Sequence, residues 1–413
     1  MPLGNYLSPL SRAHCNMLRA FKQHCQQIMA QLPSERMLAL DVLRGLTITA
    51  MILVNNPGSW RYVYAPLQHA QWHGWTLTDL IFPFFIVIVG ISIQLSLAKK
   101  TLLPKRQLLN QGLVRSAKLY ILGLFLVLFY YNFRDPNYSY LEQKLQTLRI
   151  FGVLQRIAVV YFISLIIALY CATRGRIVAA ASLTIIYLLA MYKLPYQSVY
   201  GREFVGLFEY GNSFAAWLDH TVLGAAHVHF SKATPFAFDP EGLWSSLPAI
   251  VSCISGLLIG QWLQTERNLV AKVRGLALFG VVAVWLAELW HFSLPINKNL
   301  WTPSFVLLSS GYCALALAAC LWLCDIKRYR LWCAPFIVFG ANAILFFIFA
   351  GVMARVLGMI NVGGSSLHSW LFNSLYQPAF GNYNGSLAYA LSFLVLSYCI
   401  MYQCYRRGYI FKV

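Results

Sequence analysis

Apolar residues dominate this chain in long runs that are separated by short polar segments. About 20 consecutive apolar residues form a helix long enough to cross the roughly 30 Å hydrocarbon core of a bilayer. The pattern predicts an all-α protein, a polytopic membrane bundle of about ten transmembrane helices. The expected spans cover residues 38–57, 77–97, 113–133, 150–171, 177–194, 244–264, 275–292, 303–324, 336–357 and 387–404.

The composition favours a membrane protein over a soluble one. Hydrophobic residues make up 59% of the 413-residue chain and charged residues only 11%, whereas soluble domains carry roughly 25% charged residues. A chain of this length could form several soluble domains, but that interpretation leaves the apolar runs unexplained. We expect one transmembrane domain over residues 36–413, preceded by a cytoplasmic N-terminal segment, residues 1–35.

The N-terminal segment lacks the unbroken apolar core of a cleavable signal peptide, so we expect none. Apolar residues recur there near helical spacing, which is typical of an amphipathic helix on a membrane surface. A disordered tail is the alternative, and the sequence leaves both open. The apolar positions are Leu18, Phe21, Cys25, Ile28, Met29 and Leu32.

Lysine and arginine indicate the orientation in the membrane. If the N-terminus lies inside, more than half of the 32 Lys and Arg residues fall in the inside segments, which is the bias of cytoplasmic loops. Both termini are then cytoplasmic, as an even number of spans requires. The net charge of +19 is spread over these short loops, so it favours lipid headgroups over nucleic acid as the partner.

The ten cysteines predict neither a disulfide framework nor a metal site. In this topology each lies in a span or a cytoplasmic segment, where disulfides are rare. None has the spacing of a zinc site with histidines nearby. We therefore expect no metal.

The two longest outside loops, 195–243 and 358–386, are rich in Gly, Asn, Ser and aromatic residues, and we expect them to fold over the outer mouth of the bundle. Several tryptophans lie near the same interface. They form either an aromatic belt or, for one or two of them, a surface that stacks on a sugar ring. These tryptophans are Trp60, Trp72, Trp217, Trp244, Trp301 and Trp370.

Polar residues inside or beside the spans mark function or internal pairing, because an unpaired charge in lipid is costly. Asp41 and Arg44 are three residues apart in the first span, on one helical face where they can pair. An interfacial pair whose charged groups reach the membrane surface explains them equally well. Arg115 and Lys118, near the inner end of the third span, are interpreted in that second way.

The segment between the first two spans carries the candidate chemistry. Asn55-Asn56-Pro57-Gly58 ends the first span, and His69 precedes Asp79 by ten residues. Asp79 falls in the first turn of the second span, where Thr76 or Thr78 can cap the helix. An imidazole oriented by a carboxylate is a good general base near neutral pH. A solvated loop histidine is the alternative.

Further polar residues come from other spans and outside loops. Their convergence on one polar cavity is the simplest arrangement that keeps them out of lipid. They are Gln155, Arg156, Asp239, Glu241, Glu288, His291, Asn297, Lys298, Asn299 and Asn342.

Motifs in order along almost the whole chain from Arg36 carry a family resemblance. They are Leu40-Asp41-Val42-Leu43-Arg44-Gly45, Val54-Asn55, His69-Ala70-Gln71-Trp72-His73-Gly74, Asp79 with Phe82-Pro83-Phe84, Arg149-Ile150-Phe151-Gly152-Val153-Leu154-Gln155-Arg156, Asp239-Pro240-Glu241-Gly242, Asn297-Lys298-Asn299-Leu300-Trp301 and Gly340-Ala341-Asn342. This series resembles the heparan-α-glucosaminide N-acetyltransferase family. Enzymes of that family use acetyl-CoA to acetylate the free amine of a terminal glucosamine across a membrane.

The resemblance implies an acyltransferase with acetyl-CoA as co-substrate, a small amino sugar as acceptor, and a homodimer. Lysosomal members carry an extra domain and span before this core, so the resemblance suggests a bacterial inner-membrane relative. It also implies that His69 is the catalytic histidine, with Asn55 beside it, and we expect Asp79 as its partner from the ten-residue spacing. The residues expected to bind coenzyme A are Arg44, Asp41, Gln155, Arg156 and Lys298, because its phosphates need cations and helix N-termini. The residues expected to bind the sugar are Trp72, His73, Asp239, Glu241, Asn297, Asn299 and Asn342.

Two positions depart from the family pattern. The family's tryptophan-asparagine-glycine is Trp72-His73-Gly74 here, and a glycine-histidine-glutamate of the lysosomal members is Phe349-Ala350-Gly351. Either change could alter the acceptor.

The chemistry leaves two mechanisms open. His69 can remove a proton from the attacking amine while Asn55 donates to the oxyanion, or His69 can carry the acetyl group as a nucleophile. A transporter for amino sugars or their oligosaccharides, with the same fold but no reaction, is the alternative function. A purely structural membrane subunit would explain none of the intramembrane charges.

Overall fold

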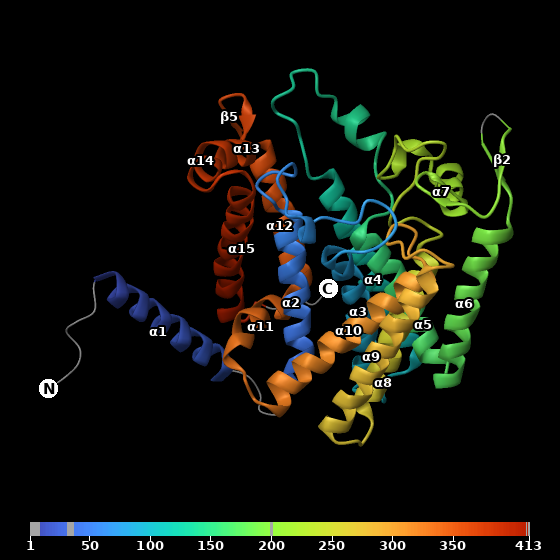
Figure 1. Ribbon diagram of the computed structural model, residues 1–413, viewed down its shortest axis with the longest axis horizontal. Coiled ribbons are helices and arrows are strands. Elements are labelled where there is room, and N and C mark those ends of the chain that lie inside the picture. The colour runs from blue at the N-terminus through green and yellow to red at the C-terminus, as the bar shows by residue number, and fades with distance from the viewer. Residues whose placement is uncertain (1–8, 31–36, 199–200, 410, 412–413) are drawn as a thin grey trace.

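The computed structural model describes residues 9–30, 37–198, 201–409 and 411, and it shows a bundle of long helices (Figure 1). Over this described part, nine helices are long and apolar enough to cross a membrane, and one bent pair adds a tenth candidate. The predicted all-α polytopic architecture is therefore confirmed. The long helices are α2 (Leu38–Asn55), α3 (Leu77–Ala98), α4 (Lys105–Leu128), α5 (Val153–Tyr170), α6 (Thr173–Lys193), α8 (Ser246–Gln264), α9 (Leu269–His291), α10 (Pro303–Cys320) and α15 (Asn382–Arg406).

The bent pair corrects the predicted span 336–357, which is not one helix. Helix α11 (Ala334–Ala341) and helix α12 (Ala343–Met359) meet at Asn342, and this pair is bent by 75°. The side chain of Asn342 binds the backbone near the C-terminus, because its Nδ2 donates to the Tyr409 carbonyl at 2.8 Å and its Oδ1 accepts from the Phe411 amide at 3.0 Å. The break is thus stabilised by chain that returns into the bundle from almost seventy residues away.

The loops on one end of the bundle carry most of the remaining structure, at the upper edge of Figure 1. We call this end the loop face; the end that carries the turns at 99–104, 265–268 and 327–330 is the opposite face. The described parts of both long loops fold over the loop face, as expected. The first contains β1 (Tyr196–Gln197), β2 (Glu203–Phe204), β3 (Phe208–Glu209), β4 (Asn212–Ser213), α7 (Phe214–Leu223) and η3 (Ala225–His227). The second contains β5 (Asn361–Val362), β6 (Ser365–Ser366), α13 (Leu367–Leu371), η6 (Phe372–Tyr376) and α14 (Gln377–Phe380).

Three short strand pairs and four helical turns complete the described architecture. Each of the three strand pairs is an antiparallel two-stranded ribbon: β1 with β2, β3 with β4, and β5 with β6. The remaining turns are η1 (Ala65–Leu67), η2 (Leu141–Leu145), η4 (Leu321–Ile326) and η5 (Leu331–Cys333).

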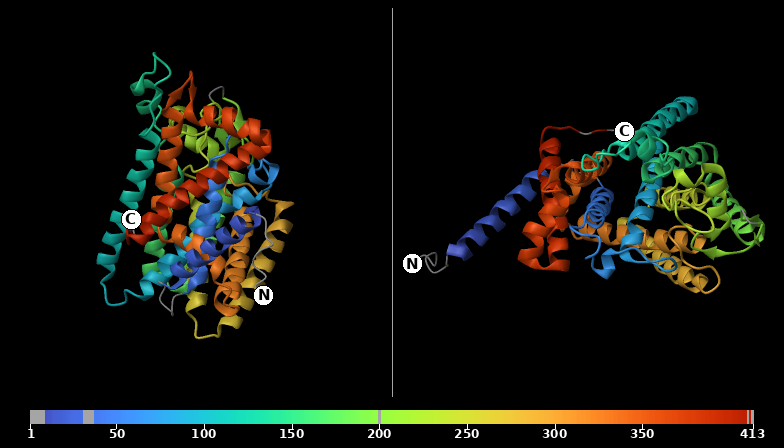
Figure 2. Two further views of the ribbon diagram at one scale, coloured as in Figure 1. Left: turned by 90° about the vertical axis from the view of Figure 1, so that its left-hand side faces the viewer. Right: turned by 90° about the horizontal axis from the view of Figure 1, so that it is seen from above.

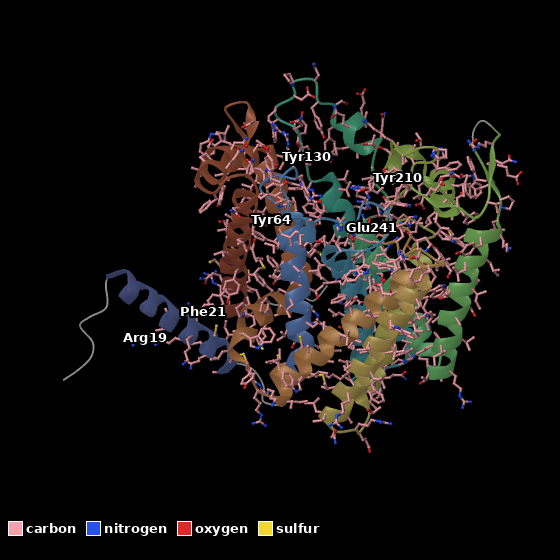
Figure 3. The ribbon with its side chains drawn as sticks, viewed as in Figure 1. Arg19, Phe21, Tyr64, Tyr130, Tyr210 and Glu241 are labelled. Carbon is pink, nitrogen blue, oxygen red and sulfur yellow. The ribbon has the colours of Figure 1, made fainter. Side chains whose placement is uncertain are left out.

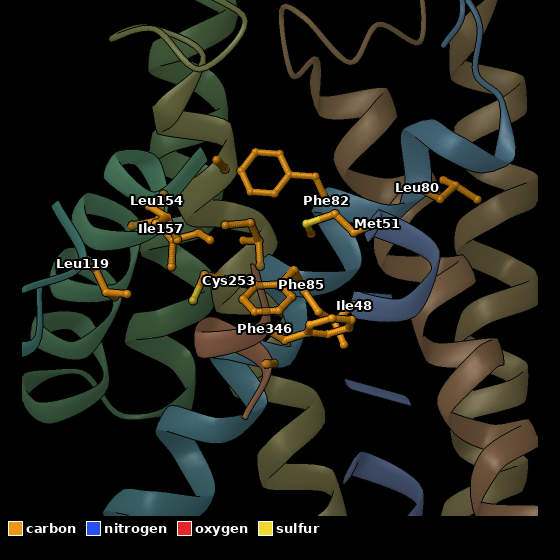
Figure 4. Packing of buried hydrophobic residues seen from close by; sticks show 14 of the residues in the cluster. Ile48, Met51, Leu80, Phe82, Phe85, Leu119, Leu154, Ile157, Cys253 and Phe346 are labelled. Carbon is orange, nitrogen blue, oxygen red and sulfur yellow. The ribbon is translucent and has the colours of Figure 1, made fainter. Parts of the chain in front are cut away.

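Helix α3 lies at the centre of the bundle and packs closely on α8. A Cβ atom added to Gly90 would lie 2.0 Å from the Cys253 carbonyl oxygen, and one added to Gly256 would lie 2.1 Å from that of Val87. Small residues permit this backbone approach, which is how helices commonly pack in membranes. Figure 4 shows the buried apolar side chains around this crossing, including Phe85 and Cys253. This close packing fixes the position of α3 relative to α8.

The described part of the N-terminal segment forms helix α1 (Pro9–Ala30), which projects away from the bundle (Figure 2). Its end packs against the protein, with Cys25 and Ile28 buried and the His24 Nε2 atom 2.7 Å from the Tyr398 hydroxyl. Phe21 is exposed on the projecting part (Figure 3). A position on the membrane surface stays a prediction.

Candidate active site

The start of α3 holds a histidine–carboxylate pair. Asp79 accepts hydrogen bonds at its Oδ2 atom from the amides of Ala70, at 2.9 Å, and Thr76, at 3.0 Å. Its Oδ1 atom lies 2.6 Å from Nδ1 of His69. We assign the proton of a neutral His69 to Nδ1, because a carboxylate accepts that hydrogen bond. The lone pair of the imidazole is then on Nε2, where a base or nucleophile needs it.

Lys298 completes this cluster from the loop between α9 and α10. Its Nζ atom lies 3.0 Å from Nδ1 of His69 and 3.5 Å from Oδ1 of Asp79. Burial lowers the pKa of Lys298, although the neighbouring Asp79 acts in the opposite direction. The Lys298 amino group thus sits beside the pair in a largely enclosed position, with only 17% of its side chain exposed.

Asn297 holds the lysine loop against the histidine loop. Its fully buried amide donates to the Trp72 carbonyl at 2.9 Å and accepts from the Leu300 amide at 2.9 Å. The Gly74 amide also donates to the Ile296 carbonyl at 2.8 Å. The predicted sugar ligand Asn297 is thus placed in the packing that brings Lys298 to His69.

A cavity of about 340 Å³ opens beside the cluster on the loop-face side. Asn55 at the end of α2 lines it, and its amide makes no hydrogen bond with any residue in the described ranges. The His69 side chain is 50% exposed and lines the same space. Other polar or aromatic lining residues include Trp72, Asp79, Arg149, His229, Phe230, Glu241, Lys298 and Asn299.

A second charge cluster forms one wall of this cavity. Arg149 donates from Nε and Nη2 to the two carboxylate oxygens of Asp239 at 2.7 and 2.6 Å, and it also binds Glu241. Burial would raise the pKa of Glu241, but Arg149 and other nearby cations hold it below its ordinary value. Glu241 is therefore an anion facing the cavity, on the loop-face side of the bundle (Figure 3).

Arg156 and Gln155 lie behind this wall and line neither this cavity nor the one described next. Arg156 is fully buried, donates to the Pro240 carbonyl at 2.8 Å, and packs 5.0 Å from the ring of Trp301. Gln155 packs directly against Gly123, because a Cβ atom added to that glycine would lie 2.3 Å from the Gln155 Oε1 atom. Arg156 thus supports the loop that carries Glu241, and both residues are buried away from the two cavities.

A larger cavity, of about 930 Å³, lies toward the opposite face. Four cations line it, namely Arg44, Lys100, Arg115 and Lys118, and so does Asn342. Arg44 reaches Asp41 at 3.4 Å and the Ser92 hydroxyl at 2.9 Å. Asp41, Arg44 and Asn342 are therefore separated from the His69 cavity.

The two cavities lie end to end along the same three helices. Helix α3 contributes Phe82 to the His69 cavity and Phe85 to the cationic one, and both rings appear in Figure 4. Helix α5 contributes Val153 and Ile157 in the same order. On α12 the residues are Phe347 and Ile344. Each pair is about one helical turn apart, or roughly 5.4 Å along the axis, so only a thin layer of apolar side chains separates the cavities.

Sequence reasoning missed several of these residues. Arg115 and Lys118 were visible as cations inside a predicted span, yet they line the larger cavity instead of only reaching the membrane surface. His229 and Phe230 gave no signal, because they lie in a long loop without local periodicity. His73 is exposed and does not line the His69 cavity, although its neighbour Trp72 does. Burial and the nearby His291 lower the pKa of His73.

The sequence of this chain is similar to that of known proteins. The family model described as heparan-alpha-glucosaminide N-acetyltransferase, catalytic, matches residues 36–268. The human heparan-alpha-glucosaminide N-acetyltransferase is 29% identical over 359 residues, which are 76% of this chain and 52% of the human protein. The mouse protein of the same name is 28% identical over 360 residues, 76% of this chain and 53% of its own length. The chain thus spans about half the length of the curated relatives it matches, and the family model covers more than half of the chain, including His69, Asp79 and Glu241. This protein belongs to the heparan-alpha-glucosaminide N-acetyltransferase family.

Proposed function

We propose that this protein is a membrane acetyltransferase that moves an acetyl group from acetyl-CoA to the amine of a glucosamine-type sugar. The observation that carries the proposal is the His69–Asp79 pair, at 2.6 Å, in a polar cavity that nearly meets a larger cationic one. Family membership supports the same reaction, because the human and mouse relatives are named for it.

The donor fits the cationic cavity. Coenzyme A carries several phosphate charges, and Arg44, Arg115 and Lys118 supply the opposite charge there. With the phosphates at the opposite face, the slender pantetheine arm would pass the apolar layer at Phe82 and Phe85 and present its thioester to His69. The predicted sidedness puts this cavity on the cytoplasmic side, so we expect acetyl-CoA to enter from the cytoplasm.

The acceptor fits the His69 cavity. A glucosamine offers an ammonium group and several hydroxyls, for which Glu241 and Asn299 are suitable partners. Trp72 and Phe230 provide aromatic surface of the kind that packs against a pyranose ring. A single amino sugar at the end of a chain can enter from the loop face, where the cavity opens.

The reaction needs a base and an oxyanion donor. In direct transfer, the amine nitrogen forms a bond to the thioester carbon, the carbon–sulfur bond breaks, and His69 Nε2 takes the proton of the amine and returns one to the thiolate. The Asn55 amide donates to the oxygen that becomes negative. In the alternative, Nε2 first attacks the thioester carbon, the carbon–sulfur bond breaks and coenzyme A leaves as its thiolate. The amine then attacks the acetyl-imidazole, the bond between the acetyl carbon and Nε2 breaks, and the amine proton passes through Nε2 to neutralise the thiolate. Asp79 fixes the imidazole in both cases.

The test is turnover by the purified protein with acetyl-CoA and glucosamine, measured as free coenzyme A and as N-acetylglucosamine. We expect turnover by the wild type and its loss in His69→Ala. The matched control is His24→Ala, on α1, because His24 lines neither cavity. Accumulation of labelled sugar in vesicles, with no coenzyme A released for any amine offered, would overturn the enzyme and favour the transporter.

We also propose the assembly and location that the family resemblance implies, a homodimer in a bacterial inner membrane. Light scattering of the detergent-solubilised protein, corrected for bound detergent, measures how many chains the particle contains. A mass of one chain would refute the dimer without affecting the proposed reaction.

A further inference from the structure

A third cavity, of about 540 Å³, lies among α6, α8, α9 and α10 and shares no lining residue with the two cavities above. Its three hydroxyl groups are already used inside the protein. Thr184 donates to the Ala180 carbonyl at 2.8 Å, Ser255 donates to the Ser252 carbonyl at 2.7 Å, and Ser310 lies 2.9 Å from Ser255. The remaining walls are apolar apart from the indole nitrogens, so the cavity suits a hydrocarbon ligand.

The cavity lies on the part of the bundle that faces lipid. Large apolar side chains are exposed along the two outer helices that border it: Leu278, Val281, Val282, Trp285 and Leu289 on α9, and Ile177, Ile185 and Leu189 on α6. The α8 residues of the lining run from Val251 to Trp262, roughly 16 Å at the helical rise of about 1.5 Å per residue. That length is about half of the roughly 30 Å hydrocarbon core, the depth of one leaflet.

The end of the cavity at the opposite face carries cations around Trp262. The indole Nε1 donates to the Lys272 carbonyl at 3.1 Å, and the Arg267 guanidinium lies 4.8 Å from the indole ring. Arg274 directly precedes Gly275, and Trp262 packs on that glycine. The Arg274 side chain has no hydrogen bond or ion pair within the described ranges. Glu266 is the one acidic residue in the α8–α9 turn, so the rim has a net positive charge.

We propose that this groove binds one acyl chain of an anionic phospholipid from the leaflet at the opposite face, with the lipid phosphate at Arg267 and Arg274. The apolar groove accepts the chain, its length matches one leaflet, and the cations stand where the headgroup of such a lipid would lie. The proposal does not depend on the proposed acetyltransferase activity.

Native mass spectrometry of the full-length protein tests the proposal, with dioleoyl-phosphatidylglycerol or dioleoyl-phosphatidylcholine added after delipidation. We expect one tightly held phosphatidylglycerol per chain and weaker binding of phosphatidylcholine. Leu258→Trp fills the groove and should lower phosphatidylglycerol occupancy at least tenfold. Leu278→Trp, the same change on the exposed surface of α9, should leave it unchanged. Equal occupancy in the two variants would overturn the proposal.

The headgroup contact is tested separately. Arg267→Gln with Arg274→Gln should remove the preference for phosphatidylglycerol, whereas Lys99→Gln with Arg106→Gln, on the same face but outside the groove, should keep it. Should Leu258→Trp fail to fold, a phosphatidylglycerol with a photoreactive acyl chain can be crosslinked to the wild type. Labelled peptides from α8 and α9 are expected; labelling spread over all lipid-facing helices, or no preference for phosphatidylglycerol in the wild type, would refute the site.

Discussion

The Nδ1 atom of His69 lies 2.6 Å from Oδ1 of Asp79, and the other oxygen of that carboxylate accepts the backbone amides of Ala70, beside His69, and Thr76, at the start of α3. The helix start therefore fixes the carboxylate, and the carboxylate fixes the imidazole. Because Asp79 occupies the Nδ1 side of the ring, Nε2 carries the lone pair that can act on a substrate. The Nζ atom of Lys298 lies 3.4 Å from Nε2.

Asp79→Asn removes the negative partner of His69 but preserves the size of the side chain. An amide can donate as well as accept, so it can turn the imidazole into the wrong tautomer. We expect kcat to fall by about 10²–10⁴-fold with little change in KM, as for other oriented catalytic histidines. Steady-state kinetics with acetyl-CoA and glucosamine measure this. Asp135→Asn, in an exposed turn, is the matched control, and an Asp79 variant as fast as this control would contradict the assigned role.

Lys298→Met removes the ammonium group that lies 3.0 Å from Nδ1 of His69. That ammonium also lies 3.5 Å from Oδ1 of Asp79, so it helps to hold the histidine–carboxylate pair in place. We expect kcat/KM to fall by about tenfold, equivalent to about 1.4 kcal/mol. Lys298→Arg keeps the charge and should keep most of the activity. If the Met and Arg variants turn over equally fast, the charge of the lysine has no role and the residue acts only through packing.

Lys118→Gln weakens the cationic cavity without touching His69. Lys118 is exposed and lines that cavity, so its interaction with a phosphate is worth about 0.5–1 kcal/mol, or roughly 2–5-fold. We expect KM for acetyl-CoA to rise by that factor while kcat stays constant. Lys99→Gln, on the same face but outside the lining, serves as the control. An unchanged KM for acetyl-CoA in Lys118→Gln would argue that the phosphates lie elsewhere.

Much of the fold follows from local sequence. Apolar runs predicted the long helices because each run alone is long enough to span a bilayer. The bend at Asn342 was missed because it depends on contacts with Tyr409 and Phe411, far along the chain. No local pattern encodes such a contact.

The same distinction holds in the candidate site. His69 and Asp79 were predicted to pair because only ten residues separate them. The pairing of Arg149 with Asp239 joins residues 90 apart, so the sequence indicated two polar motifs without their geometry. Arg156 was expected to bind coenzyme A because the phosphates of that molecule need cations. Its burial against Trp301 and the Pro240 carbonyl favours internal pairing instead.

The stability of the folded loop 195–243 on the loop face should depend on the pH through Asp219. This residue lies in α7, outside the predicted spans, and burial raises its pKa to about 7, compared with roughly 3.9 in an unfolded chain. Between about pH 4 and pH 7 the folded protein therefore holds a proton on Asp219 that the unfolded chain has released. The stability that this proton supports, up to about 4 kcal/mol, is fully present below about pH 4 and is lost as the pH rises through 7. We expect the Tm of Asp219→Asn to change less between pH 5 and 7.5 than that of the wild type. Parallel curves for the two proteins would refute this.

The most direct test of the reaction centre is a density map of the protein with a non-hydrolysable acetyl-CoA analogue bound. We expect the phosphates of the analogue among Arg44, Arg115 and Lys118, and its pantetheine arm between Phe82 and Ile344. Its carbonyl carbon should lie within about 3–3.5 Å of His69 Nε2, the near-attack range. An analogue bound in that cavity with its carbonyl carbon more than about 4 Å from His69 and nearer another nucleophile or base would contradict the assignment.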